Sequence, residues 1–164
     1  MDRLISWLGD KFTFSPTGPG TSSMEHKKSR ADLEPLILNP RALSDLPTNF
    51  FPEPKRGICS WQTLFSSSRT NTDSLTVGIA SCPPKAGYLA YHRHAQAEIY
   101  HVISGNGIVR INGIEYNIEK GSVVFIPGDA EHGVRNLNET EELKWLYCFA
   151  ADSFEDVHYR FSEE

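Results

Sequence analysis

The sequence has few cysteines, no excess of basic residues and no long apolar run. Its three cysteines, Cys59, Cys82 and Cys148, are scattered and form no Cys-x-x-Cys pair. Reduced, buried thiols in a cytoplasmic protein are therefore the simplest interpretation. The 16 basic and 21 acidic residues leave a net charge of -5, which gives no electrostatic footprint for nucleic acid or an anionic membrane. No apolar run approaches the ~20 residues that a membrane span needs. We therefore expect neither nucleic acid nor a membrane as a partner.

The N-terminal part of the 164-residue chain differs in composition from the remainder, which is long enough for one domain with a core of its own. Residues 1–14 carry apolar side chains at helical spacing, which predicts either a short docking helix or a frayed end. Residues 15–30 are rich in Gly, Pro, Ser and charge, as in a linker or a disordered tail. We predict an N-terminal extension over residues 1–50, partly disordered or with a short helix, and a folded domain over residues 51–164.

From Gly57 onward, short apolar runs alternate with turn residues. Gly- and Asn-containing turns at residues 104–107 and 112–113 tolerate positive φ and suit hairpins. Many short antiparallel strands joined in this way predict an all-β fold, either a double-sheet jelly roll or a small barrel. The expected strands cover residues 58–65, 75–81, 88–94, 98–103, 108–111, 115–118, 122–126, 133–136 and 143–149.

Four side chains in two of these segments are typical of a metal site. His92 and His94 are two residues apart, so on an extended strand they share a face. Glu98 has the same parity and joins them if the chain bends or bulges between, and His132 follows a Pro-Gly-Asp turn. Imidazole and carboxylate suit a divalent transition metal such as Fe(II), Mn, Ni, Co or Zn.

The two segments resemble the two sequence motifs of the cupin superfamily. The opening spacer of the first motif is one residue shorter than usual, and in the second Pro127-Gly128-Asp129 replaces Pro-x-Gly. The resemblance implies a cupin double-stranded β-helix, which is an RmlC-like jelly-roll barrel, with the three histidines and Glu98 as metal ligands. The matching positions are Gly87, His92, His94, Glu98 and Gly105 in the first motif and Gly121, Pro127, His132 and Asn136 in the second.

Other side chains are expected to complete the pocket. Tyr100 has the parity of Glu98 and should face the same cavity, where a phenol beside a divalent ion has a lowered pKa and can act as a general base. The alternative is an aromatic that only packs. Tyr88 shares the parity of His92 and is expected to face inward. Trp61 and Tyr147 lie on strands, either as core or as part of an aromatic cage for a cationic substrate.

A narrower resemblance concerns the run His92-x-His94-x-x-x-Glu98-x-Tyr100 together with His132. This pattern is similar to the active site of the small cupin lyases that cleave dimethylsulfoniopropionate. The resemblance implies that the metal takes the substrate carboxylate, that Tyr100 removes the proton next to it, and that dimethyl sulfide leaves. The long N-terminal extension departs from the compact lyases.

Three functions remain open on the sequence alone. The favoured one is a metal-dependent lyase or isomerase, which uses a Lewis acid and Tyr100 on a small carboxylate or carbonyl substrate. The second is an Fe(II)-dependent dioxygenase or oxidase. The third is a non-enzymatic metal- or ligand-binding cupin module. Cupins often dimerise through barrel edges, so a homodimer is one expected arrangement.

Overall fold

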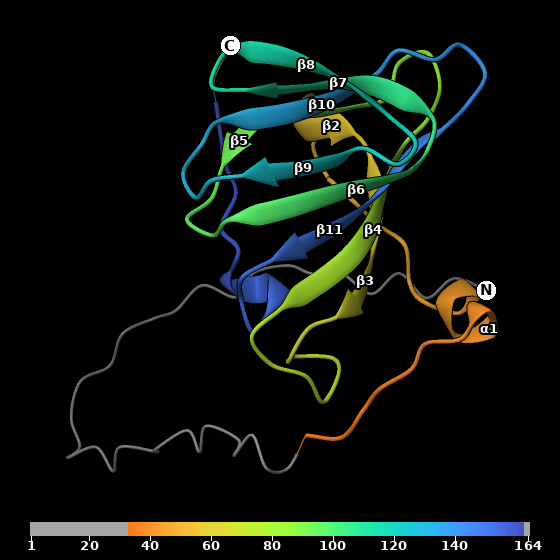
Figure 1. Cartoon of the computed structure of the whole chain (residues 1–164), viewed down its shortest axis with the longest axis vertical. Helices are drawn as coiled ribbons and strands as arrows, with labels where there is room; N and C mark the ends of the chain where they lie inside the picture. The colour runs from red at the N-terminus through yellow and green to blue at the C-terminus, as the bar shows by residue number, and fades with distance from the viewer. Residues whose placement is uncertain (1–32, 163–164) are drawn as a thin grey trace. The chain divides into compact units, whose positions relative to one another are not determined.

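Nearly all of the regular structure in residues 33–162, the part that the computed structural model describes, is antiparallel β-strand (Figure 1). The docking helix and linker predicted over residues 1–30 lie outside these described residues. One short helix, α1 (Pro40–Ser44), and two 3-10 turns, η2 (Pro54–Arg56) and η3 (Phe154–Asp156), interrupt the strands. The strands are β1 (Asn49–Phe50), β2 (Gly57–Ile58), β3 (Ser60–Phe65), β4 (Thr76–Cys82), β5 (Tyr88–Arg93), β6 (Glu98–Ser104), β7 (Asn106–Ile111), β8 (Ile114–Glu119), β9 (Val123–Ile126), β10 (His132–Asn136), β11 (Leu143–Phe149) and β12 (Arg160–Phe161).

The strands form two sheets that interleave distant parts of the chain. One sheet has the order β1-β3-β4-β11-β6-β9, and the other has the order β12-β5-β10-β7-β8, with β2 also paired to β5. In each sheet a late strand separates two early ones: β11 lies between β4 and β6, and β10 lies between β5 and β7 (Figure 1). This interleaving is the jelly-roll arrangement that the sequence predicts.

Strand β11 shows why these segments form strands. Its residues alternate strictly between buried and half-buried, and the buried ones are Leu143, Trp145, Tyr147 and Phe149. An alternating pattern of this kind lets one face of an antiparallel sheet pack on a core while the other faces outward. β11 pairs with both β4 and β6, so its four large apolar side chains lie at the centre of the core.

Strand β5 breaks its alternation with a β-bulge. Val134 on β10 pairs with Leu89, and His132 pairs with His92, so β5 advances three residues while β10 advances two. As a result Leu89 and His92 are both buried although their parities differ. The parity prediction placed Tyr88 inside with His92. The structure instead turns Tyr88 to the outer face of the sheet, where its hydroxyl donates to the Pro54 carbonyl oxygen at 3.0 Å.

Residues 33–50, which the sequence assigned to the extension, contain α1 and β1. Asn39 caps the helix by accepting a hydrogen bond from the Ala42 N–H, and β1 pairs with β3 through Asn49 and Trp61. The boundary at residues 50 and 51 itself stays a prediction. Among residues 33–162, no helix has the length and apolarity that a membrane span requires.

Candidate metal centre

Three histidines converge inside the barrel. His92 lies on β5, His132 begins β10 directly opposite it, and His94 follows the end of β5. Each of the three is at most 1% exposed. One ring nitrogen from each lies within 4.8 Å of those from the other two, so together they form a group that could hold a metal ion.

The backbone fixes the orientation of all three rings. The Nδ1 atom of His92 lies 2.8 Å from the Ala90 carbonyl oxygen, and that of His132 lies 2.8 Å from the Ala130 carbonyl oxygen. His94 Nδ1 lies 2.9 Å from the Gln96 carbonyl oxygen. Because a carbonyl oxygen can only accept, each neutral ring carries its proton on Nδ1 and leaves a lone pair on Nε2. This is the usual arrangement for a metal-binding histidine.

The turn before β10 positions His132. Asp129 takes the positive φ of 61°, and its N–H donates to the His94 carbonyl oxygen at 2.8 Å. Gly128 lies against the backbone at Ala95, where an added Cβ would meet the carbonyl oxygen at 2.3 Å. A glycine at this position therefore lets the turn pack directly on the His94 segment, which brings the two motifs together.

Glu98 lies next to this group of three histidines but is not part of it. It begins β6 in the other sheet, is 2% exposed, and places Oε2 3.3 Å from Nε2 of His94 and 3.3 Å from Nε2 of His132. The three Nε2 atoms and this Oε2 are buried and have no hydrogen-bond partner. Unpartnered buried lone pairs that face one another are costly unless a cation lies between them.

The donor set fits a divalent ion. Donors bound to one ion at about 2.0–2.2 Å lie roughly 3–4 Å apart, and the Glu98 oxygen lies at such a distance, 3.3 Å, from the Nε2 atoms of His94 and His132. Nitrogen and carboxylate donors suit Fe, Mn, Ni, Co and Zn alike, so they do not choose among these metals.

Burial, followed by the nearby charges of His132 and His94, lowers the pKa of His92 well below its ordinary value. His92 is therefore neutral at pH 7, as a ligand must be.

A small aromatic-lined cavity adjoins Glu98. Its volume is about 20 Å³, which is room for roughly one water molecule. Trp61 and Tyr147, two of the predicted pocket residues, line this cavity, and so does Tyr100. Tyr88 does not line it, because its side chain lies on the outer face of the sheet. The remaining walls include the rings of Phe51, Trp145, Phe154 and Tyr159.

Tyr100 is fully inside the barrel. It is 2% exposed and pairs with Tyr147 across β6 and β11, with its ring centroid 6.3 Å from that of His132. Burial, followed by the negative charge of Glu98, raises the pKa of Tyr100 well above its ordinary value. This is the opposite direction from the sequence-based expectation, which assumed a divalent ion nearby. A divalent ion bound by the histidines would act against this increase in the pKa of Tyr100.

The sequence analysis did not single out Tyr159, which covers the histidines. Its ring stacks on that of His92, with centroids 4.6 Å apart and an interplanar angle of 21°, and lies 5.6 Å from the ring of His94. Burial and the charge of Glu98 raise the pKa of Tyr159 well above its ordinary value. Tyr159 directly precedes β12, which pairs with β5 and places Phe161 opposite His92. This pairing brings Tyr159 to the histidines.

Comparisons with known proteins agree with this architecture. The family model described as "Cupin domain" matches residues 78–149. The protein named dimethylsulfoniopropionate lyase DddW of Ruegeria pomeroyi is 36% identical over 118 residues, which cover 72% of this chain and 76% of that protein.

Solved structures show the same fold. A cupin-2 domain protein of Rhodospirillum rubrum, Rru_A2000, aligns with a TM-score of 0.62 at 19% identity, over 73% of this chain and 76% of that one. A structure described under the DMSP lyases RdDddP and RnDddQII aligns with a TM-score of 0.60 at 22% identity, over 72% of this chain and 63% of that one. At these identities the likeness concerns the fold alone. The sequence match to the Ruegeria protein goes further, and by it the chain belongs to the cupin superfamily, in the family of dimethylsulfoniopropionate lyase DddW.

Proposed function

We propose that the protein is a metal-dependent lyase that cleaves dimethylsulfoniopropionate or a close analogue into dimethyl sulfide and an unsaturated carboxylate. The observation that carries the proposal is the buried group of four unpartnered donor atoms, on His92, His94, His132 and Glu98, beside the phenol of Tyr100. The 36% identity to the Ruegeria protein supports the choice of substrate.

The chain's own residues divide the work of the reaction. The three histidines and Glu98 would hold a divalent ion, which would act as a Lewis acid toward the substrate carboxylate. The positive charge of a bound ion would lower the pKa of Tyr100, against the effect of burial and Glu98, and the resulting phenolate accepts the proton from the carbon next to that carboxylate. The electron pair of the broken C–H bond becomes the new C=C bond, and the C–S bond breaks with its pair leaving on dimethyl sulfide. The sulfonium charge is lost in this step, so the sulfur product is neutral.

The aromatic walls suit a sulfonium cation. Trp61 lies 6.1 Å from Phe154, ring centroid to centroid, and Phe154 lies 6.1 Å from Tyr147. Aromatic faces attract cations most strongly where water is excluded. Because the cavity of about 20 Å³ is smaller than such a substrate, side chains must move to admit it. Trp61 and Phe154 are only half-buried and are the expected moving parts.

Release of dimethyl sulfide tests the proposal. Protein loaded in turn with Fe(II), Mn, Ni, Co and Zn is incubated with dimethylsulfoniopropionate, and the headspace is analysed by gas chromatography. We expect release with at least one ion. The rate should be at least about 100-fold lower in Tyr100→Phe, which keeps the ring but removes the base. The matched control is Tyr116→Phe on the exposed surface of β8, which should retain the wild-type rate. Wild-type protein that carries an ion and releases nothing would contradict the proposal.

Oxygen consumption, measured in the same samples, separates the lyase from an oxygenase. The same donor set suits Fe(II), whose dioxygen chemistry would consume oxygen and stop when zinc replaces iron. A lyase releases dimethyl sulfide without consuming oxygen. A module that only binds metal or ligand would give neither signal.

A further inference from the structure

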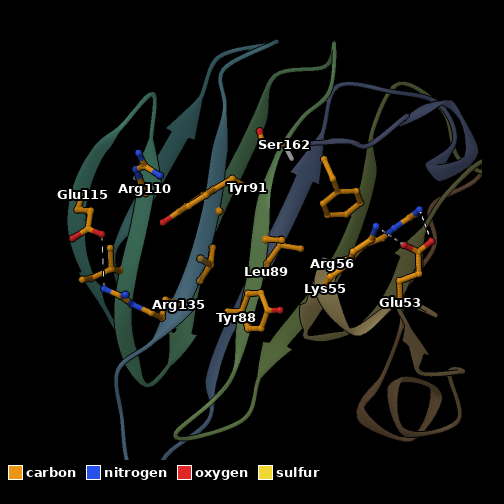
Figure 2. A pocket seen from close by; sticks show the side chains of 15 residues that line it. Glu53, Lys55, Arg56, Tyr88, Leu89, Tyr91, Arg110, Glu115, Arg135 and Ser162 are labelled. Atoms are coloured by element: carbon orange, nitrogen blue, oxygen red, sulfur yellow. Dashed lines mark hydrogen bonds and ion pairs between the residues drawn. The ribbon is translucent and has the colours of Figure 1, made fainter. Parts of the chain in front are cut away.

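A second, larger hollow lies on the outer face of the β12-β5-β10-β7-β8 sheet (Figure 2). Its volume is about 720 Å³, within the range of about 300–1,000 Å³ that small-molecule sites occupy. It is separated from the histidines by the thickness of one sheet. Tyr91 lines it while the next residue, His92, faces inward, and Gly133 lines it while the preceding residue, His132, faces inward.

The floor of this outer hollow is built by an aromatic ring and a guanidinium group. An added Cβ on Gly133 would lie 2.7 Å from Cδ1 of Tyr91, so the absence of a side chain lets the Tyr91 ring lie against β10. The Arg110 guanidinium lies over that ring at 4.4 Å from its centroid. Figure 2 shows these two side chains next to each other on the sheet. Among residues 33–162, no carboxylate forms an ion pair with Arg110.

The charge of the outer hollow is opposite in sign to that of the chain. Its walls carry the cationic side chains of Lys55, Arg56, Arg110 and Arg135 against only the carboxylates of Glu53 and Glu115, whereas the whole chain has a net charge of -5. Glu53 is shared by Arg56 at 2.7 Å and Lys55 at 3.6 Å. The Glu115–Arg135 pair is long, at 3.8 Å, and both side chains are at least half exposed. Arg110 and Arg135 therefore keep capacity for another anion.

Apolar surface accompanies these charges. Tyr88 pairs with Arg135, and Ile108 pairs with Arg135 from the other side, so an arginine is flanked by an aromatic ring and an aliphatic side chain. Guanidinium groups bind carboxylate and phosphate through paired N–H donors and also stack on planar rings. The β5 bulge produces this arrangement, because it turns both Tyr88 and Tyr91 outward.

We propose that the outer hollow binds a small planar anion, an aromatic ring that carries a phosphate or carboxylate group. Arg110, which lies over the Tyr91 ring, and Arg135 bind the charged group, and Tyr88 and Ile108 contact the ring of the ligand. The site is independent of the lyase chemistry, which lies on the inner face of the sheet.

Isothermal titration calorimetry tests this site with two probes, adenosine monophosphate and 4-hydroxybenzoate. We expect at least one probe to bind the wild-type chain, with an affinity that falls as salt is raised because the contacts are ionic. Arg110→Gln and Arg135→Gln should each weaken binding about tenfold, the loss expected for one charge-assisted contact. Arg41→Gln, on α1 and outside the hollow, is the matched control and should bind as wild type.

Further arms separate the alternatives. His92→Ala should leave probe binding unchanged, because His92 faces the other side of the sheet. Thermal unfolding of each arginine variant checks that it is folded. Failure of both probes to bind, equal affinity in the arginine variants and wild type, or loss of binding in His92→Ala would overturn the proposal. So would sedimentation showing that Arg110→Gln turns a dimer into a monomer, since the hollow would then be an interface between copies.

Discussion

The ring of Tyr159 stacks on the ring of His92, with centroids 4.6 Å apart and an interplanar angle of 21°. This contact joins the last strand of the chain to the candidate metal centre. It covers a face of the imidazole, whose Nδ1 lies 2.8 Å from the Ala90 carbonyl oxygen. Groups that orient a ligand in this way contribute to metal affinity without touching the metal.

Replacing Tyr159 tests this support. Tyr159→Ala should weaken metal binding by about 10-fold or more, because the imidazole loses the ring that confines it. Tyr159→Phe keeps the stacked ring and should bind metal nearly as well as wild type. Competition with a fluorescent chelator measures both affinities. Equal affinities for the alanine and phenylalanine variants would show that stacking does not position His92.

Glu98→Gln should shift stability in opposite directions with and without metal. In metal-stripped protein, the buried Oε2 of Glu98 faces two imidazole lone pairs, so a neutral amide should raise the free energy of unfolding by about 1–3 kcal/mol. In metal-loaded protein the same change removes a ligand and should lower it. Urea unfolding in each state measures the two signs. Destabilisation in both states would contradict the electrostatic account of the cluster.

The metal-stripped protein should lose stability in mild acid. Burial holds the pKa of His92 well below that of an unfolded histidine, which is about 6.5, so only the unfolded chain gains a proton there as the pH falls. Its contribution is thus present above about pH 6.5 and declines below it, by about 1.4 kcal/mol per pH unit. His92→Asn, which does not titrate, should flatten the slope between about pH 6.5 and pH 5 in urea unfolding. An unchanged slope would mean that His92 is not the group responsible.

The aromatic wall should recognise charge rather than shape. Trp61→Leu keeps an apolar side chain but removes the π face, so the KM for dimethylsulfoniopropionate should rise roughly 5- to 30-fold. In 4-methylpentanoate an uncharged CH group replaces the sulfonium sulfur of the substrate. The inhibition constant of this compound should change much less. Steady-state kinetics gives both values. A parallel loss for the two compounds would indicate that Trp61 only fills space.

Sequence patterns anticipated the sheets well because alternation and turn residues report directly on local structure. The alternation along β11 and the Asn112-Gly113 hairpin between β7 and β8 are examples. The hairpin expected at residues 104–107 is wrong, because β6 and β7 belong to different sheets and Gly105 links the two sheets instead. The parity-based prediction that Tyr88 faces inward is wrong, because one extra residue in the β5 bulge reverses the face of the β5 residues before it. The bulge depends on the pairing of β5 with β10, which local sequence does not reveal.

The convergence of His94 and Glu98 was predicted on parity, but the structure achieves it differently. His94 ends the β5 segment in one sheet, and Glu98 begins β6 in the other, so residues 95–97 cross between sheets. Tyr159 could not be found from local pattern at all. Its position depends on the pairing of β12 with β5, which joins residues nearly 70 positions apart, as Phe161 and His92 show.

The central claim is that three imidazoles and a carboxylate bind one divalent ion inside the barrel. Elemental analysis of natively purified protein by mass spectrometry tests it most directly, with His92→Ala compared against His101→Ala, a histidine on the exposed surface of β6. We predict about one transition-metal ion per chain in wild type and in His101→Ala, and far less in His92→Ala. Wild-type protein without such an ion, or equal metal in the two variants, would contradict the account.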